Sequence, residues 1–316
     1  MLRKIIINPK YAVLLALTIA IIAVVITSPV YRKQMNAAME RINSQSRLLE
    51  TKFGTMEYAI HGQGKPVLLI HGAGGGFDQG LWLGQTTLES SYQFIAPSKF
   101  GYLNSNTPKE FSAQLQAEQY KILLDYIGLE KATIVAVSAG GPSSMQFASD
   151  YPDKVEKLIL LSAVSMPPNP NDKAPFFIKI IQLIQRSDYA YWLFTKVFKS
   201  QILNLVGIPS GDYKKFTPEQ KNLANELLEV MHPMSLRYDG TITDGLIIKN
   251  FDIPKSIATP TLIIHSKNDG LVHYSHAEHS HQNIKNSTLI LYDQGGHGAL
   301  SQLKDARKQI KMFLED

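Results

Sequence analysis

Three residues of the 316-residue sequence have the side-chain types of a nucleophilic catalytic site. Ser138 lies in the segment AVSAGG after the apolar run TIVAV, Asp269 lies in SKNDGLV after TLII, and His297 lies in DQGGHG after STLILY. A serine hydroxyl becomes nucleophilic when an imidazole takes its proton and a carboxylate orients that imidazole. The three groups that this chemistry requires therefore occur in the order Ser, Asp, His.

Each of these residues also has an ordinary structural interpretation. A serine after a strand can cap a helix, an aspartate can form a turn, and a loop histidine can simply be exposed. However, each follows the carboxyl end of an expected strand, which is where open parallel sheets place their sites. Asp269 and His297 are 28 residues apart, about one helix plus one strand. We therefore predict that Ser138, Asp269 and His297 converge as a triad.

The segment HGAGGG (71–76) follows another apolar run and is a second candidate element of the site. A glycine run allows backbone N–H groups to turn toward a developing oxyanion. A flexible turn is the plain alternative. A dinucleotide-binding loop would need G-x-G-x-x-G and an acidic residue after the next strand, where the sequence has APS (96–98), so that interpretation fails. Because Gly72 follows it directly, His71 is expected to be a structural hydrogen-bonding residue.

Alternating strand and helix signals indicate the scaffold that positions these residues. Short aliphatic runs without period-two alternation predict strands at 65–72, 92–98, 131–138, 156–162, 259–266 and 287–293. Helical patterns lie between or after them at 111–129, 142–152, 273–285 and 301–314. Together these predict a mostly parallel, doubly wound α/β sheet, with an antiparallel hairpin at one edge formed by 51–64.

Residues 166–255 contain no strong strand pattern. Since long structureless loops are rare in compact domains, we expect this segment to be an inserted helical lid. The core is then expected to comprise 51–165 and 256–316.

The amino terminus contains the uncharged run AVLLALTIAIIAVVIT (12–27), preceded and followed by basic residues. This pattern predicts an anchor at 1–33 with a transmembrane helix at about 11–30, and a juxtamembrane linker at 34–50. A cleavable signal peptide and a buried helix are the alternatives. The basic residues that precede the run favour an orientation with the amino terminus on the cytoplasmic side and the bulk of the chain on the extracytoplasmic side.

Composition excludes several other classes. The absence of cysteine rules out disulfides, thiolate metal sites and a cysteine nucleophile. The net charge is +5, but the basic residues are spread along the chain and form no dense run, so nucleic acid is not an expected partner. Four histidines between 273 and 281 are interpreted as a solvated polar face, and neither a metal nor a cofactor is predicted.

From Thr51 to Asp316 the chain resembles the α/β-hydrolase superfamily, in particular the lid-bearing branch of esterases, lipases and carbon–carbon hydrolases. The resemblance rests on the segments 71–76, 136–141, 266–272 and 296–297. Two positions depart from the usual pattern: Ala136 replaces a glycine, and SKFGY (98–102) stands where many relatives have Asp-x-x-Gly-x-Gly.

The resemblance implies a role for each site residue. Ser138 would be the nucleophile, His297 the base and then the acid, and Asp269 the group that orients His297. The backbone N–H groups of Ala73 and Ala139 would form the oxyanion hole. A nucleophilic aspartate, as in some relatives, is excluded by the serine.

The expected function is that of a membrane-tethered serine hydrolase. Its substrate would be a small or lipid-like apolar molecule with a carboxylic-ester-type bond, and Trp82 would line either the pocket or the core. Two alternatives remain open: hydrolysis of a carbon–carbon bond in ring-cleavage products, and a ligand-binding or receptor protein without turnover.

Overall fold

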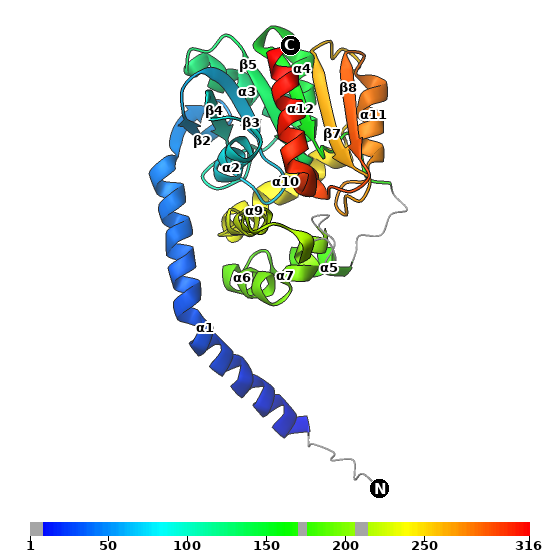
Figure 1. The fold of residues 1–316 in the computed structure, drawn as a ribbon. Helices are drawn as coiled ribbons and strands as arrows, with labels where there is room; N and C mark the ends of the chain where they lie inside the picture. Colours follow the sequence, from blue (N-terminus) through cyan, green and yellow to red (C-terminus); the bar gives the residue numbers. More distant parts are fainter. Residues whose placement is uncertain (1–8, 170–175, 206–213) are drawn as a thin grey trace.

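An eight-stranded sheet forms the centre of the molecule (Figure 1). The computed structural model describes residues 9–169, 176–205 and 214–316. The strand order is β1-β2-β4-β3-β5-β6-β7-β8, in which β1 and β2 form an antiparallel hairpin, β2 is antiparallel to β4, and all other neighbours are parallel. The strands are β1 (Arg47–Thr51), β2 (Gly54–His61), β3 (Lys65–Ile70), β4 (Tyr92–Pro97), β5 (Ala132–Val137), β6 (Val155–Leu161), β7 (Thr261–Ser266) and β8 (Ser287–Tyr292). The predicted α/β class with a mostly parallel sheet is confirmed.

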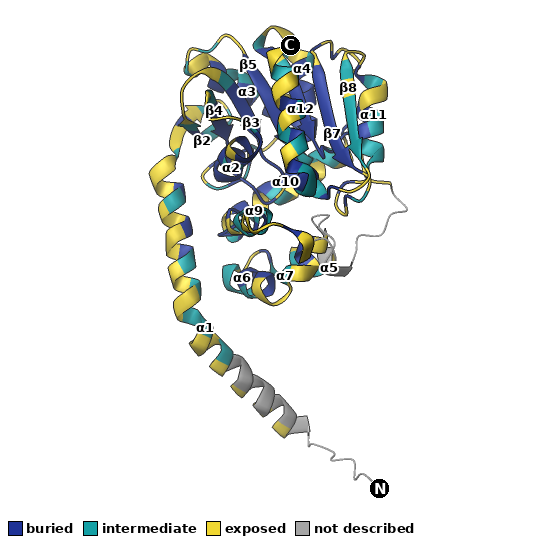
Figure 2. Cartoon of the chain, viewed as in Figure 1, coloured by how far each residue is buried: buried dark blue, intermediate teal, exposed yellow. Residues whose placement is uncertain are grey.

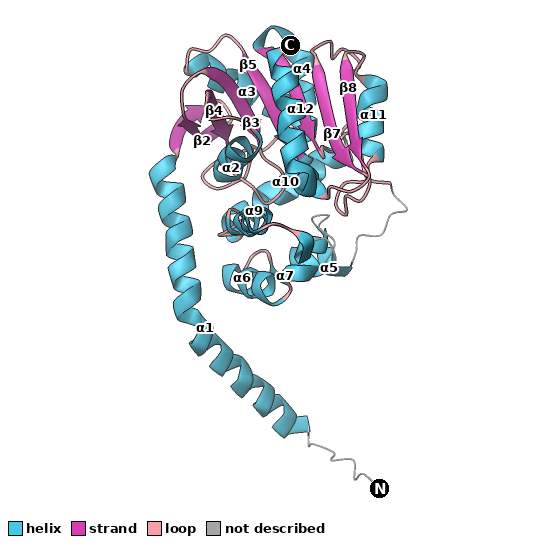
Figure 3. Cartoon of the chain, in the orientation of Figure 1, coloured by secondary structure: helices cyan, strands magenta, loops and turns pink. Residues whose placement is uncertain are grey.

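Helices cover both faces of the sheet (Figure 3). One face carries α3 (Ala113–Tyr126), α4 (Gly141–Asp150) and α11 (Ser275–Asn283), and the other carries α2 (Phe77–Thr87) and α12 (Leu303–Glu315).

The continuous apolar character of the strands follows from this double coverage. In β3, Leu68 and Ile70 pack on the side of α3 and α4, whereas Val67 and Leu69 pack on the side of α2 and α12. All four side chains are fully buried, and each contributes about 1.5–3 kcal/mol by leaving water. Figure 2 shows the same burial along the central strands.

A helical insert separates β6 from β7. It contains α5 (Phe176–Ile184), α6 (Asp188–Val197), α7 (Lys199–Leu205), α9 (Pro218–Glu229) and α10 (Tyr238–Lys249). Residues 170–175 and 206–213 of the predicted lid lie outside the described residues. Phe216, Ala224 and Leu228 of the insert form an apolar cluster that also includes Leu300 of the core. In Figure 1 the insert lies beyond the carboxyl ends of the strands.

In Figure 1, the second half of helix α1 (Pro9–Gln45) lies beside the domain, and its first half extends away beyond the insert. The segment 34–50, predicted as a linker, forms the end of this helix and most of β1. Met35, Ala38 and Ile42 are buried, at helical spacing along one face. Earlier in α1, the ring of Tyr31 packs against Trp192 of the insert. The second half of α1 is therefore part of the folded domain.

The predicted membrane anchor is wrong for the part of the chain that the structure describes. Among those residues, no helix has both the length and the apolar character that crossing a bilayer requires. Residues 1–8 of the predicted anchor, and several side chains between 9 and 21, lie outside the described set. The Thr27 hydroxyl, counted within the predicted span, is hydrogen-bonded to the Tyr189 hydroxyl at 2.6 Å. The extracytoplasmic placement rested on the anchor and is overturned with it.

Candidate active site

Ser138 occupies a strained turn between β5 and α4. Its φ is +52°, a region that residues other than glycine rarely adopt and that is typical of a nucleophile placed on a sharp strand-to-helix turn. The turn needs small neighbours, because a Cβ at Gly140 would lie 2.7 Å from the Ile70 carbonyl oxygen. Val164 N–H donates to the Ser138 carbonyl at 2.9 Å and helps to hold the turn. Ala136, the departure from the usual glycine, is fully buried without disrupting this geometry.

Asp269 and His297 are brought together by the neighbouring strands β7 and β8. His297 Nδ1 donates to Asp269 Oδ2 at 2.8 Å, and Leu271 N–H and Val272 N–H donate to Asp269 Oδ1 at 2.9 and 3.0 Å. His265 Nε2 lies 3.4 Å from Oδ2. Burial raises the pKa of Asp269, but the two histidines and the Val272 N–H outweigh burial and hold that pKa well below its usual value. An ionised Asp269 keeps the proton on Nδ1 and leaves Nε2 of His297 as the acceptor.

The loop that carries His297 is held by two residues that sequence reasoning missed. Asn268 Oδ1 accepts hydrogen bonds from Gly295 N–H and Gly296 N–H, both at 2.9 Å. Ser162 Oγ accepts one from Gly298 N–H, also at 2.9 Å. Both follow strand ends, and that position is the only signal in the sequence that could have identified them.

Ser138 and His297 line the same cavity, which has a volume of about 120 Å³ and is partly open to solvent. Among the hydrogen bonds of the described residues, none joins the Ser138 hydroxyl to His297. Such bonds are often long in empty sites and shorten when substrate binds. Ala73 and Trp82 also line the cavity, and Trp82 Nε1 donates to Glu226 Oε2 of the insert at 3.2 Å. The complete lining consists of Gly72, Ala73, Gln79, Trp82, Leu83, Thr86, Thr87, Val137, Ser138, Leu227, Met231, Leu271, His297, Gly298, Leu300 and Leu303.

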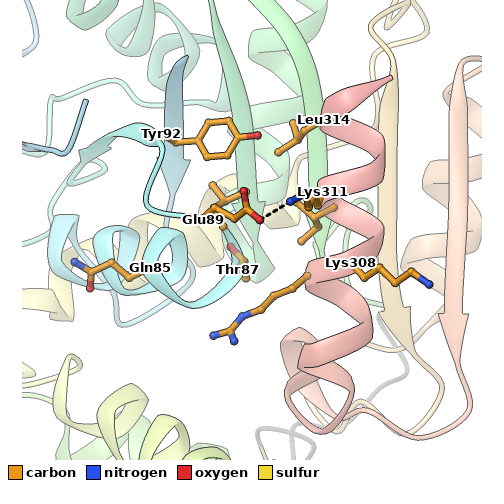
Figure 4. A pocket seen from close by; sticks show the side chains of 10 residues that line it. Gln85, Thr87, Glu89, Tyr92, Lys308, Lys311 and Leu314 are labelled. Carbon is orange, nitrogen blue, oxygen red and sulfur yellow. Dashed lines mark hydrogen bonds and ion pairs between the residues drawn. The ribbon is translucent and has the colours of Figure 1, made fainter. Parts of the chain in front are cut away.

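A second hollow lies between α2, β4 and α12 (Figure 4). Its lining combines apolar side chains with the basic side chains of Arg307, Lys308 and Lys311, and Lys311 is paired with Glu89 at 2.7 Å. None of the predicted site residues lines it. It contains no nucleophile with a neighbouring base, so it is not the candidate active site.

The glycine loop is fixed by buried polar contacts. His71 Nδ1 donates to the Gly72 carbonyl at 2.7 Å, and its Nε2 accepts from Lys99 N–H at 3.0 Å. Burial holds the pKa of His71 well below its usual value, so the ring is neutral, with both nitrogens in use. Gly72 N–H donates to Gln79 Oε1 at 2.9 Å, which leaves Ala73 N–H as the predicted oxyanion donor of this loop.

A buried ion pair connects the Ser138 turn to the insert. Lys99 Nζ donates to both carboxylate oxygens of Asp244 in α10, each at 2.7 Å, and to the Ala139 carbonyl at 3.0 Å. The Tyr102 hydroxyl donates to Asp244 Oδ2 at 2.6 Å. Lys99 belongs to the SKFGY segment that departs from the family pattern. The segment that differs from the usual pattern thus supplies a lysine that is hydrogen-bonded to the backbone beside the candidate nucleophile.

A second buried cluster joins α1, α2 and the insert. Asp78 accepts hydrogen bonds from Arg237 at 2.8 and 2.9 Å and from Arg41 of α1 at 3.1 Å. Arg237 also donates to the Gly75 carbonyl of the glycine loop at 2.6 Å, and both arginines donate to the His232 carbonyl. Burial alone would raise the pKa of Asp78, but the two arginines lower it. Helix α1 is thus connected to the glycine loop through two hydrogen-bonded side chains.

We expect His232 to make the stability of the protein depend measurably on pH. Burial, together with the nearby cations, lowers its pKa to about 4, whereas the unfolded value is about 6.5. As the pH falls, the unfolded chain binds this proton first, so stability that is present above pH 6.5 is lost progressively toward pH 4. Between pH 7 and pH 4 we expect the free energy of unfolding to fall by about 3 kcal/mol more in the wild type than in His232→Gln. Urea titrations of both proteins test this, and equal losses would contradict it.

Comparisons with known proteins agree with this fold. The family model described as alpha/beta hydrolase fold matches residues 65–302. The uncharacterized hydrolase YcgS of Bacillus subtilis (strain 168) is 32% identical over 77% of this chain and 88% of its own length. The 2-hydroxy-6-oxo-6-phenylhexa-2,4-dienoate hydrolase of Comamonas testosteroni is 23% identical over 77% and 86%. The structure of an alpha/beta hydrolase fold protein from Nakamurella multipartita superposes with a TM-score of 0.72 at 22% identity, covering 85% of this chain and 98% of that one.

Proposed function

Because this chain belongs to the alpha/beta hydrolase fold family, we propose that it is a serine hydrolase that cleaves a carboxylic-ester-type bond in a small or lipid-like apolar substrate. One observation carries the proposal: a cavity lined by both Ser138 and His297, in which His297 is hydrogen-bonded at 2.8 Å to a buried, ionised Asp269.

The reaction would proceed through an acyl-enzyme. His297 Nε2 takes the Ser138 proton as Oγ attacks the ester carbonyl, and the backbone N–H groups of Ala73 and Ala139 stabilise the oxyanion. His297 then protonates the departing alkoxide, so the ester C–O bond breaks and the acyl group remains on Ser138. A water molecule, deprotonated by His297, releases the acid.

The chemistry of the cavity favours an uncharged substrate. Apart from His297, no residue among those lining the described cavity carries a titratable side chain, and eight of them are large apolar residues: Trp82, Leu83, Val137, Leu227, Met231, Leu271, Leu300 and Leu303. The substrates of the alternative reaction, carbon–carbon bond hydrolysis, are dienoic keto acids. In this cavity their carboxylate would be desolvated without a cation to pair with, which is energetically costly. A neutral ester or carbamate ester carries no such penalty.

We propose that the helical insert acts as the predicted lid. Leu227 of α9 and Met231, both in the insert, line the same cavity as Ser138. Substrate would then enter between the insert and the core, and the apolar insert side chains would exclude water during acylation.

Labelling and a substrate panel test the proposal. A fluorophosphonate probe should attach to Ser138, and a series of p-nitrophenyl esters of increasing chain length should be hydrolysed. A ring-cleavage dienoic keto acid should not be turned over. Efficient turnover of that acid would favour the carbon–carbon alternative. The absence of both labelling and turnover would favour a binding protein without catalysis.

A further inference from the structure

Gln79 is a buried polar residue of the cavity wall to which the mechanism assigns no role. It lies in the first turn of α2, is 5% exposed, and accepts a hydrogen bond at Oε1 from Gly72 N–H at 2.9 Å. A Cβ at Gly75 would come within 2.5 Å of Oε1 and 2.8 Å of Cδ, so the amide group lies directly against the glycine loop. The side chain is therefore fixed in position.

These contacts also fix which end of the amide is free. A backbone N–H can only donate, so the atom that faces Gly72 must be the amide oxygen, and the NH₂ group is on the other branch of the amide. The oxygen is the only atom of this amide with a hydrogen-bond partner among the described residues. Since Gln79 lines the cavity that holds Ser138, its two N–H donors are available to a ligand there.

The amide group of Gln79 lies close to the candidate nucleophile. A Cβ at Gly72 would lie 3.1 Å from Ser138 Cβ and 3.6 Å from Gln79 Oε1, so only this glycine separates the amide from the serine. The rest of the cavity is mainly apolar. A hydrocarbon chain packed here would displace water from the amide N–H groups. The hydrogen bonds to that water would not be replaced, which is unfavourable.

We propose that Gln79 is a specificity-determining residue that selects esters with a second, uncharged oxygen acceptor a few bonds from the scissile carbonyl. An ether, keto or hydroxyl oxygen at that place accepts from Gln79 Nε2, whereas a methylene leaves the donor unpaired. This inference rests on the proposed serine-hydrolase function and narrows its substrate class.

Matched substrates isolate the effect of that oxygen. The acyl pair is p-nitrophenyl methoxyacetate and p-nitrophenyl butyrate, and the alcohol pair is 2-methoxyethyl butyrate and butyl butyrate. Within each pair an oxygen replaces one methylene, and kcat/KM gives an oxygen-over-methylene ratio. Dividing the wild-type ratio by that of a variant cancels the intrinsic reactivity of the esters.

Three variants separate a donor role from a structural one. Gln79→Met removes both ends of the amide, and Gln79→Glu, assayed at pH 8, keeps an acceptor for Gly72 N–H but has no N–H. Gln85→Met is the same substitution on the exposed side of α2, outside the cavity. We expect the ratio of at least one pair to fall about 5- to 100-fold in both Gln79 variants and to stay unchanged in Gln85→Met.

The remaining outcomes overturn the inference. Unchanged ratios in Gln79→Met, or an equal loss on both members of each pair, would show that Gln79 does not read the second oxygen. A ratio that falls in Gln79→Met but not in Gln79→Glu would assign the effect to the Gly72 loop. If the wild type neither hydrolyses these esters nor reacts with a fluorophosphonate, the proposed function itself fails, which is a distinguishable result.

Discussion

We expect Ser138→Ala to lower kcat/KM for p-nitrophenyl butyrate by about 10⁴- to 10⁶-fold and to abolish fluorophosphonate labelling. The hydroxyl has no hydrogen-bond partner among the described residues, and alanine fits the same turn, so the variant should fold normally. Steady-state hydrolysis and intact-protein mass spectrometry after labelling measure the two effects. Ser149→Ala, toward the far end of α4 from Ser138, is the matched control and should keep full activity.

The size of this effect depends on the triad acting as a unit. Without the Ser138 oxygen, His297 has no proton to accept, so Ser138→Ala/His297→Ala should be no slower than Ser138→Ala alone. A further loss in the double variant, or more than about 1% residual activity in the single one, would show that another nucleophile carries the reaction.

The parallel sheet was predictable because both of its faces are buried. The six strands expected from apolar runs occur as β3 to β8, with ends within a few residues of those predicted; TIVAV, for example, lies within β5. Glycine, serine and aspartate after these runs marked the strand ends. The candidate site residues occupy those ends, and for that reason the sequence could propose that Ser138, Asp269 and His297 converge. Their catalytic roles remain predictions.

Contacts between distant segments were not predictable from spacing. Lys99 and Asp244 are 145 residues apart, and nothing near either of them indicates the other. Likewise, Arg41 and Arg237 meet at Asp78 only because α1 and the insert both pack against α2. Their partners are set by the tertiary fold and not by local pattern.

The amino-terminal prediction failed for a specific reason. The run 12–27 was interpreted in isolation, although Met35, Ala38 and Ile42 continue the helix with an apolar face of their own. That spacing is typical of a helix packed on a core, and it was the available signal that residues 35–42 belong to the domain.

The largest loss of stability is expected from Lys99→Met. Asp244 is buried, and burial raises its pKa even with Lys99 beside it. Without the ammonium group, the Tyr102 hydroxyl is the one hydrogen-bond partner that the carboxylate keeps among the residues that the structure describes. Removing one member of a buried ion pair costs about 3–5 kcal/mol, because the remaining charge stays out of water without compensation. Urea denaturation at pH 7 measures this loss.

The pH dependence and a double variant identify the unpaired carboxylate as the cause. In Lys99→Met the folded-state pKa of Asp244 rises further above its unfolded value. Stability is then retained at low pH and lost as the pH rises through the folded pKa, so the deficit relative to wild type should shrink from pH 7 to pH 5. Lys99→Met/Asp244→Leu removes the buried charge and should recover much of the loss. Lys121→Met, which breaks the exposed pair with Asp125, should change stability only slightly. A Lys99→Met protein as stable as that control would contradict the assignment of a stabilising role to this pair.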